Sequence, residues 1–297
     1  MKVKFLAFTD LHYHSFESGD GNYRLNQIVQ AVKDNNPDFC ISLGDFCEPV
    51  PENQRLLQKL RDTGVPMYFS VGNHESDRHT LDELLDFWGD TPEYYSFEKG
   101  DCKFIVLNTC YGDFDGEVKL FYQHNFRMKG TKYPIIPDEQ RRWLEKELSD
   151  DKKHVIFSHH SFFNDFPNRG VYGKEEYRKL FENSNVILSM NGHDHGDAME
   201  DKNGILYYTV NSASYVWLGS KISSSEELQR RYGYLQGMLH YKEPLYVVVE
   251  IDDSKILIRG TDSSYRDVTP DDIGLKEYMW NGVSILPRTS SVLKKMD

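Results

Sequence analysis

Short apolar runs punctuate the first two thirds of the chain, and each is followed by Gly, Asp, Asn or His. They are rich in Val, Ile, Leu and Phe, and they are Val3 to Phe8, Phe39 to Leu43, Met67 to Val71, His154 to Phe157 and Val186 to Met190. Short runs of this composition are typical of interior strands that are buried on both faces. The pattern therefore predicts a sheet core assembled from strands that lie far apart in the sequence.

Helical periodicity separates the early strands. Apolar residues recur at helical spacing in the segments Asn22 to Asn35, Glu52 to Asp62, Arg78 to Trp88 and Asp138 to Leu148. This alternation predicts a βαβαβ order and a largely parallel sheet. Two further strands, Tyr94 to Phe97 and Lys103 to Leu107, are expected to pair as a hairpin around a turn at Gly100.

The later chain carries weaker patterns. Strands are expected in three segments that we assign to a second sheet layer, Ile205 to Val210, Leu245 to Ile251 and Lys255 to Arg259. The stretch from Tyr111 to Ile136 lacks a clear period, so we interpret it as a long surface loop. Its part from Tyr111 to Tyr133, with Tyr122, Arg127 and Lys132, is either a substrate lid or phosphate contact or a solvated insertion. Segment 223–242 is polar with weak helical character, and 271–297 receives no element.

Composition fits a globular protein. Of 297 residues, 39% are hydrophobic and 28% are charged, which favours one large α/β domain with a substantial core. No run approaches the length of a membrane-spanning helix, and the start of the chain lacks the pattern of a signal peptide. Four cysteines without a pairing pattern behave as small hydrophobes, so we expect a cytoplasmic protein.

Charge narrows the partners. The formal net charge of -12 disfavours nucleic acid and anionic membranes as partners. An anionic substrate would therefore need local positive charge, which bound metal ions can supply.

Residues with metal-binding side chains follow each of the five strand runs. The groups are Asp10-Leu11-His12, Gly44-Asp45, Gly72-Asn73-His74-Glu75, His159 and Gly192-His193-Asp194-His195. Sites in open α/β sheets form beyond the carboxyl ends of the strands, so these groups are expected at one edge. Carboxylate, amide and imidazole ligands suit Zn, Mn, Fe or Co, and the absence of thiolates disfavours a closed structural zinc site. The ligands outnumber the needs of one ion, whereas two ions sharing a carboxylate would use them all.

In this order the groups resemble the motifs of the calcineurin-like metallophosphoesterase family, which are D-x-H, G-D, G-N-H-[DE], a lone His after a strand, and G-H-x-H. The resemblance extends from about Lys2 to Asp197. It implies a four-layer α/β/β/α sandwich of two mixed sheets flanked by helices. It also implies a metallophosphoesterase domain over residues 1–262, which leaves 263–297 as a C-terminal extension of unknown role.

The resemblance also implies roles for individual residues. One ion would be bound by Asp10, His12 and His195, and the other by Asn73, His159 and His193. Asp45 would bridge the two ions, and His74 would be a catalytic residue that binds no metal. The ions would be two divalent or mixed-valence cations, Mn, Fe or Zn, and a hydroxide bridging them would attack phosphorus.

Several residues stay outside the predicted ligand set. Two interpretations stay open for each of four further residues: the side chain faces the cleft, or it has a surface or supporting role. These residues are His14, His124, His160 and Asn164. Cys47 is expected to be a buried hydrophobe rather than a redox sensor or ligand. The second motif continues as Phe46-Cys47-Glu48 and lacks the Asp-Arg-Gly of protein Ser/Thr phosphatases, which disfavours that branch of the family.

The function expected from these features is hydrolysis of a phosphodiester or phosphomonoester in a small molecule. Two alternatives stay open, a nuclease of the same family and a protein-binding scaffold that keeps the metals without catalysis. The lack of a basic stripe counts against the nuclease, and the full set of ligands together with His74 counts against the scaffold.

Overall fold

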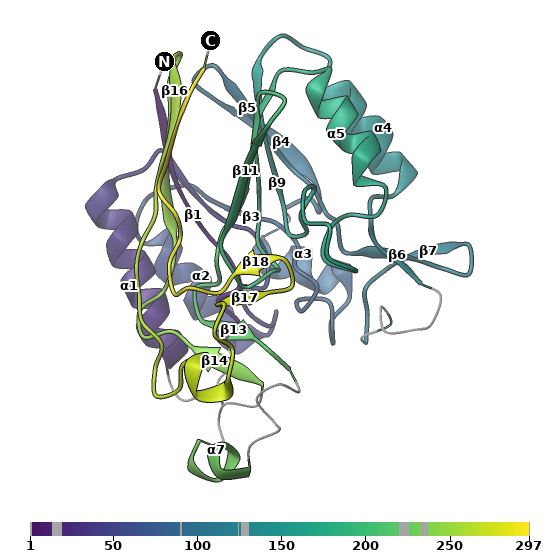
Figure 1. The fold of residues 1–297 in the computed structure, drawn as a ribbon. Helices are drawn as coiled ribbons and strands as arrows, with labels where there is room; N and C mark the ends of the chain where they lie inside the picture. The colour runs from purple at the N-terminus through teal and green to yellow at the C-terminus, as the bar shows by residue number, and fades with distance from the viewer. Residues whose placement is uncertain are drawn as a thin grey trace.

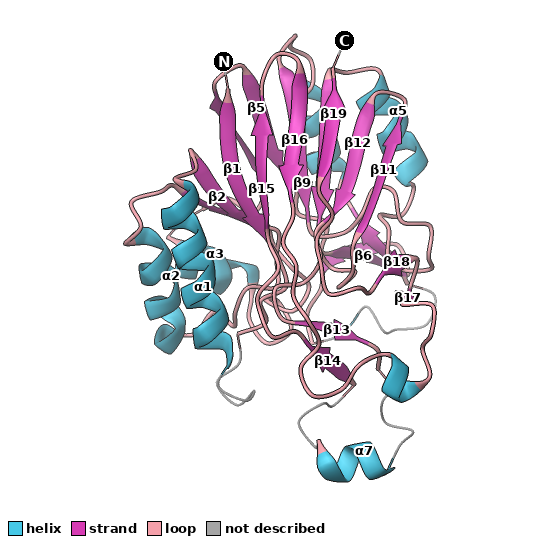
Figure 2. Ribbon diagram, turned by 60° about the vertical axis from the view of Figure 1, so that its left-hand side comes forward, coloured by secondary structure: helices cyan, strands magenta, loops and turns pink. Residues whose placement is uncertain are grey.

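Two six-stranded sheets pack face to face and are flanked by helices (Figures 1 and 2). The structure is a computed structural model that describes residues 2–13, 20–89, 91–123, 125, 131–219, 226–232 and 237–296. The layers confirm the predicted α/β/β/α sandwich. Among these residues we find no helix that could span a lipid bilayer.

The first sheet has the strand order β19-β16-β15-β1-β2-β3. Its members are β1 (Val3–Phe8), β2 (Phe39–Ser42), β3 (Met67–Phe69), β15 (Val247–Ile251), β16 (Lys255–Arg259) and β19 (Val292–Lys295). Strands β1, β2 and β3 are parallel to one another, as predicted. Strand β15 runs antiparallel to β1, β16 antiparallel to β15, and β19 antiparallel to β16. The assignment of β15 and β16 to a second sheet layer was therefore wrong, because they extend the first sheet beside β1.

The second sheet has the order β11-β12-β10-β9-β5-β4. Its members are β4 (Tyr95–Lys99), β5 (Cys102–Val106), β9 (Lys153–Ser158), β10 (Val186–Asn191), β11 (Ala198–Lys202) and β12 (Ile205–Thr209). The four inner strands are parallel and both edge strands are antiparallel, so this sheet is mixed. The predicted hairpin is confirmed as the β4–β5 pair.

Helices cover the outer face of each sheet (Figures 1 and 2). The first sheet packs against α1 (Asp20–Asn35), α2 (Gln54–Arg61, preceded by the 3-10 turn η1, Pro51–Asn53) and α3 (Leu81–Trp88), and the second against α4 (Asp138–Glu147) and α5 (Lys174–Glu182). Helix α3 begins three residues later than predicted because Thr80 caps it, and Glu83 completes the capping box. No helix was predicted over α5.

Aromatic side chains join the two sheets. Phe5 of β1 stacks on Phe39 of β2 with ring centroids 4.9 Å apart. Its ring also meets the edges of Phe104 and Phe157, at 5.8 and 5.5 Å, which belong to β5 and β9 of the other sheet. This buried layer fixes the separation of the sheets, and with it the edge at which their carboxyl ends meet.

The segment interpreted as a long loop contains a small antiparallel sheet. It consists of β6 (Tyr111–Phe114), β7 (Glu117–Leu120) and β8 (Lys132–Ile135), in the order β7-β6-β8. The loop interpretation was wrong because Asp115 and Gly116, both at positive φ, form a tight hairpin turn that links two short strands.

The C-terminal part adds short elements below the sheets. These are β13 (Tyr215–Trp217) paired with β14 (Met238–His240), α7 (Glu226–Arg231), η3 (Asp271–Ile273), and β17 (Met279–Trp280) paired with β18 (Val283–Ser284). The weak helical character expected within 223–242 corresponds to α7. Strand β19 pairs with β16, which places the end of the described chain in the first sheet. The division of the chain at residue 262 stays a prediction.

Candidate metal centre

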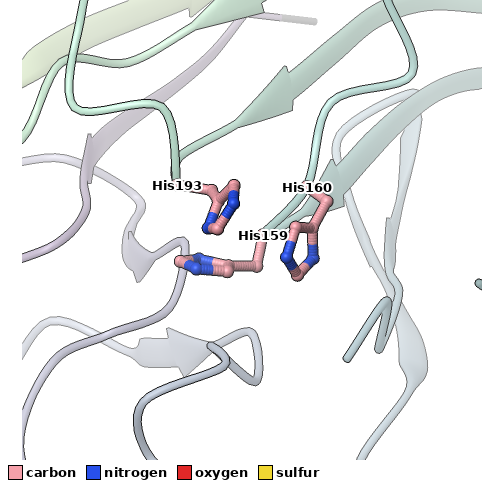
Figure 3. A group of neighbouring side chains, drawn as sticks. All are labelled: His159, His160 and His193. Carbon is pink, nitrogen blue, oxygen red and sulfur yellow. The ribbon is translucent and has the colours of Figure 1, made fainter. Parts of the chain in front are cut away.

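All seven predicted ligands lie together at the carboxyl ends of strands from both sheets. Asp10 and His12 follow β1, Asp45 follows β2 and Asn73 follows β3 in the first sheet. His159 follows β9, and His193 and His195 follow β10 in the second sheet. Figure 3 shows two of these side chains, His159 and His193, close to each other and to His160. The site is thus a seam between the sheets.

Much of this cluster has an unusual backbone. A positive φ, between 46° and 66°, is found at five of the seven positions, Asp10, His12, Asp45, His193 and His195. Side chains other than Gly rarely adopt this conformation, and such strain gathers at functional sites. The glycines of the motifs permit the close packing, since a Cβ at Gly72 would collide with Asp45 and one at Gly192 with Thr9. The chain therefore bends sharply to turn these side chains inward.

Asp10, His12 and His195 form the first group. Asp10 Oδ1 lies 3.2 Å from His195 Nε2 and 3.6 Å from His12 Nε2, and the two imidazole nitrogens are 3.1 Å apart. His195 Nδ1 donates to the carbonyl oxygen of Tyr215 at 2.8 Å. That hydrogen bond fixes the tautomer and leaves Nε2 with a lone pair toward Asp10 and His12.

His159, Asn73 and His193 form the second group. His159 Nε2 lies 3.0 Å from Asn73 Oδ1, while its Nδ1 donates to the carbonyl oxygen of Leu43 at 2.8 Å. The His193 ring lies with its centroid 5.0 Å from that of His159. As in the first group, a backbone carbonyl orients an imidazole so that its other nitrogen faces the cluster.

Asp45 stands between the two groups. Its Oδ2 lies 3.6 Å from His12 Nε2 in the first group and 3.3 Å from His159 Nε2 in the second. Its Oδ1 accepts the backbone N–H of His74 at 2.8 Å. The carboxylate is therefore fixed by one oxygen and directs the other toward both groups.

Two buried oxygens test whether metal ions fit here. Asp10 Oδ1 and Asp45 Oδ2 are both inaccessible to solvent, and neither takes part in a hydrogen bond. A buried carboxylate oxygen without a partner is costly, and a coordinated cation removes that cost. Both oxygens face imidazole nitrogens, so the set of oxygen and nitrogen donors fits divalent first-row metals.

The protonation states of Asp45, Asp10 and His12 suit metal binding, whereas that of His159 does not: burial lowers the pKa of His159, but the charges of Asp45 and Asp10 outweigh it and raise this pKa to about 10. Burial raises the pKa of the Asp45 carboxyl, but the charges of His159 and His74 outweigh it and hold this pKa well below its usual range. The pKa of Asp10 is also lowered, chiefly by the charge of His195 acting against burial. Burial lowers the pKa of His12 to about 4. Ionised carboxylates and a neutral imidazole are the forms that ligate metals.

His74 lies beside the cluster rather than within either group. Its Nδ1 is 2.6 Å from Asp77 Oδ2, and its ring is partly buried, with 43% of the side chain exposed. Burial of the ring lowers its pKa, but the charges of Asp45 and Asp77 and the Asp77 hydrogen bond outweigh this, so the pKa of His74 is raised. Asp77 was missed in the sequence, although its position three residues after His74 is a usable signal.

Glu75 is a second residue to which sequence reasoning assigned no role. Its carboxylate is buried and accepts three backbone N–H groups, from Gly72 at 2.6 Å, Phe46 at 2.7 Å and Asp45 at 3.1 Å. These contacts join the second and third motifs. The fourth position of the G-N-H-E motif was the signal available.

A cleft of about 410 Å³ opens above the cluster. Its lining includes ligand candidates and His74, together with Arg169, Trp217 and Asn281 from outside the motifs. His160 also lines it, but its Nδ1 lies 2.8 Å from Thr109 Oγ1, which fixes the ring. Asn164 instead supports the surrounding loops by donating to Asp194 Oδ2.

The structure tests the prediction for Cys47 but not those for three other residues. Cys47 is buried in the hydrophobic cluster between the first sheet and its helices, as expected for a small hydrophobe. His14, His124 and Arg127 lie outside the described residues.

Comparisons with known proteins agree with this geometry. The sequence profile of a family described as calcineurin-like phosphoesterase matches residues 3–197. A dimetal phosphatase from Danio rerio has a similar fold, with a TM-score of 0.62 and 15% identity over 87% of this chain and 95% of that one. GAP50, described as the anchor in the inner membrane complex of Plasmodium, has a TM-score of 0.56 and 13% identity over 98% of this chain and 97% of that one. No curated protein sequence gives a significant match.

Proposed function

Because this chain belongs to the calcineurin-like phosphoesterase family, we propose that it hydrolyses a phosphodiester or phosphomonoester of a small molecule. The family depends on a pair of metal ions, and the chain carries groups of side chains that could hold them. Asp10, His12 and His195 would hold one ion, and Asn73, His159 and His193 the other. Mn, Fe or Zn would each suit these ligands.

The observation that carries the proposal is the place of Asp45. Its Oδ2 is within 3.6 Å of an imidazole nitrogen in each group, at His12 and at His159. A single oxygen shared in this way is what a bridging ligand between two ions requires. With only one ion in the site, one of the two groups would be left without a role.

The chain's own residues would prepare the reaction. When bound, a pair of ions held by these residues would polarise a phosphate and make water nucleophilic near neutral pH. His74, beside the cluster in the cleft, would hydrogen-bond the phosphoryl group or protonate the departing oxygen. Asp77 holds the His74 ring through Nδ1 and favours its protonated form. His74 would thus be both oriented and charged for this step.

The two alternatives are less well supported. The formal net charge of -12 counts against a nuclease, because nucleic acid binding depends on basic surfaces. A scaffold without catalysis is consistent with the fold alone, since one protein with this fold is described as an anchor. A scaffold role does not explain why the ligand cluster has a strained backbone and two buried carboxylate oxygens without hydrogen bonds.

A substrate panel tests the proposal. Purified protein supplied with Mn, Zn or Fe is assayed on bis(p-nitrophenyl) phosphate, p-nitrophenyl phosphate, cyclic nucleotides and single-stranded DNA. We expect metal-dependent hydrolysis of a small phosphoester that is lost in the Asp45→Asn variant. Hydrolysis of DNA alone would favour the nuclease, and inactivity on every substrate with metals bound would favour the scaffold.

We also propose a reducing location such as the cytoplasm. All four cysteines are buried and free, at Cys40, Cys47, Cys102 and Cys110. Buried free thiols are characteristic of proteins kept under reducing conditions.

A further inference from the structure

Arg169 carries a basic side chain in the cleft above the candidate metal centre. Among the described residues that line this cleft it is the only Lys or Arg. It lies in the loop between β9 and α5, and no motif of the sequence analysis includes it. In a chain with a formal net charge of -12, a single cation beside a phosphate-binding centre requires an explanation.

The neighbours of Arg169 hold its guanidinium without neutralising it. Nη1 donates to the carbonyl oxygen of His193 at 3.3 Å. It also lies 3.3 Å from His193 Nε2, but that nitrogen would hold either the metal or the ring proton when His193 binds an ion, so it is not counted as an acceptor. With the Asn281 amide oriented so that its own contacts are satisfied, Oδ1 accepts from Nε at 3.2 Å and from Nη2 at 2.6 Å. The carboxylate of Asp194 interacts electrostatically with Arg169, but its Oδ2 accepts a hydrogen bond from Asn164 Nδ2. The guanidinium has more N–H groups than these neutral acceptors use.

Asn281 is placed for this contact by the C-terminal hairpin β17–β18. Asn281 and Gly282 form its two-residue turn, and both have positive φ, at 50° and 84°, as such turns require. The Asn281 carbonyl oxygen accepts from Asn164 Nδ2 at 3.1 Å. Trp280 Nε1 donates to the same Oδ1 as Arg169, at 3.2 Å. The turn therefore presents one side-chain oxygen to the guanidinium.

The hairpin is also tied to the last metal-binding motif. Ser284 of β18 and Asp197, two residues after His195, exchange both backbone hydrogen bonds, at 2.7 and 3.0 Å. The hairpin lies beyond residue 197, where the match to the family profile ends. Its register against the motif thus fixes where Asn281, and through it Arg169, stands over the cleft.

We propose that Arg169 binds a non-bridging phosphate oxygen of the substrate and that Asn281 positions the guanidinium of Arg169 for this contact. The preferred substrates would then be phosphomonoesters. This inference rests on the proposed phosphoesterase function. A monoester has one more charged oxygen than a diester, and a guanidinium pairs strongly with such an oxygen. Arg169 is a substrate-binding residue in this account, whereas Asn281 is a positioning residue.

Four variants test the inference. Arg169→Ala and Arg169→Lys remove or reshape the cation, Asn281→Ala removes its support, and Arg141→Ala removes an equal charge from the exposed face of α4. Each Mn-loaded protein is assayed on p-nitrophenyl phosphate and bis(p-nitrophenyl) phosphate. Orthophosphate binding is measured by calorimetry, and metal content by elemental analysis.

We expect Arg169→Ala to raise KM for the monoester and Kd for orthophosphate about 10-fold to 100-fold, as for loss of a hydrogen bond to a charged group. KM for the diester should change less, and metal content should not change. Arg169→Lys should recover part of the loss, and Asn281→Ala should raise KM with a smaller effect on kcat. Arg141→Ala should match the wild type.

The outcomes separate this inference from the proposed function. If Arg169→Ala leaves the orthophosphate Kd unchanged, Arg169 does not bind phosphate, whatever the activity. Equal effects on both substrates would overturn the preference for monoesters, and lower metal content would assign Arg169 to support of His193 instead. A wild type that binds orthophosphate but hydrolyses no phosphoester would refute the proposed function alone. Should Arg169→Ala fail to fold, Arg169→Lys and Asn281→Ala decide the question.

Discussion

The buried carboxylate of Glu75 accepts the backbone N–H of Asp45 at 3.1 Å and so holds the residue that stands between the two ligand groups. The same Oε2 accepts from Gly72, which ties Asp45 to the loop that carries Asn73. Groups that hydrogen-bond to metal ligands orient them and so contribute to metal affinity.

Glu75→Gln is therefore expected to weaken metal binding about 10-fold to 100-fold. The amide has only one acceptor oxygen, so its NH₂ group would face backbone N–H donors. Metal titration followed by elemental analysis measures the effect, and Glu98→Gln on the exposed part of β4 is the matched control. Unchanged affinity in Glu75→Gln would remove its supporting role.

His74→Asn is expected to leave metal content nearly intact while kcat falls about 100-fold to 10,000-fold, the usual contribution of a general acid. His74 belongs to neither ligand group, so only the chemical step should suffer. His79→Asn serves as the control, because His79 contacts Glu48 and is absent from the described lining of the cleft. A His74 variant with normal turnover would exclude this residue from catalysis.

Asp150 should make the stability of the fold depend on pH. Hydrogen bonding from Lys103 lowers the pKa of Asp150 to about 2, with further help from the N–H of Lys152 and from His154. Because the folded pKa lies below the unfolded value of about 3.9, the stabilisation is present above that value and is lost as pH falls toward 2. The group is 38% exposed, so solvent screening keeps the effect small.

Urea unfolding at several pH values checks this. At pH near 6 the urea midpoint of unfolding should be lower for Asp150→Asn than for the wild type, and this difference between the midpoints should shrink steadily as the pH is lowered. Asp151→Asn is the neighbouring control and should follow the wild type throughout. A gap that is constant with pH would show that the effect is not electrostatic.

Phe5→Ala should lower the free energy of unfolding by about 3–5 kcal/mol, because it opens a cavity in the aromatic layer between the sheets. Phe5 is fully buried and touches aromatic rings from both sheets. Phe5→Leu, which refills part of the space, should cost less. Equilibrium urea unfolding gives both values, and a loss below about 1 kcal/mol would mean that the core readjusts around the gap.

The strands that carry the site could be predicted because each is a continuous apolar run. An apolar run does not indicate which strand lies beside it in a sheet, so β15 and β16 were assigned to the wrong sheet. Strands β6 and β7 were missed because neither contains an apolar run: their sequences are Tyr-Gly-Asp-Phe and Glu-Val-Lys-Leu. Helix α5 buries only Tyr177 and Phe181, which is too few apolar residues for a clear helical period.

The same limit applies to the site. The ligand types at the strand ends were visible in the sequence, and the structure brings them together, although their assignment to two ions stays a prediction. Arg169 and Asn281 are more than 100 residues apart, and their contact exists only because the C-terminal hairpin pairs with Asp197. No spacing within the chain could indicate such a pair.

The most direct test of the account is an anomalous diffraction map of crystals grown with saturating Mn. We predict two peaks about 3.5–4 Å apart, one beside Asp10, His12 and His195 and the other beside Asn73, His159 and His193, with Asp45 touching both. A single peak, or two peaks that do not share Asp45, would contradict the paired-metal centre from which the rest of the account follows.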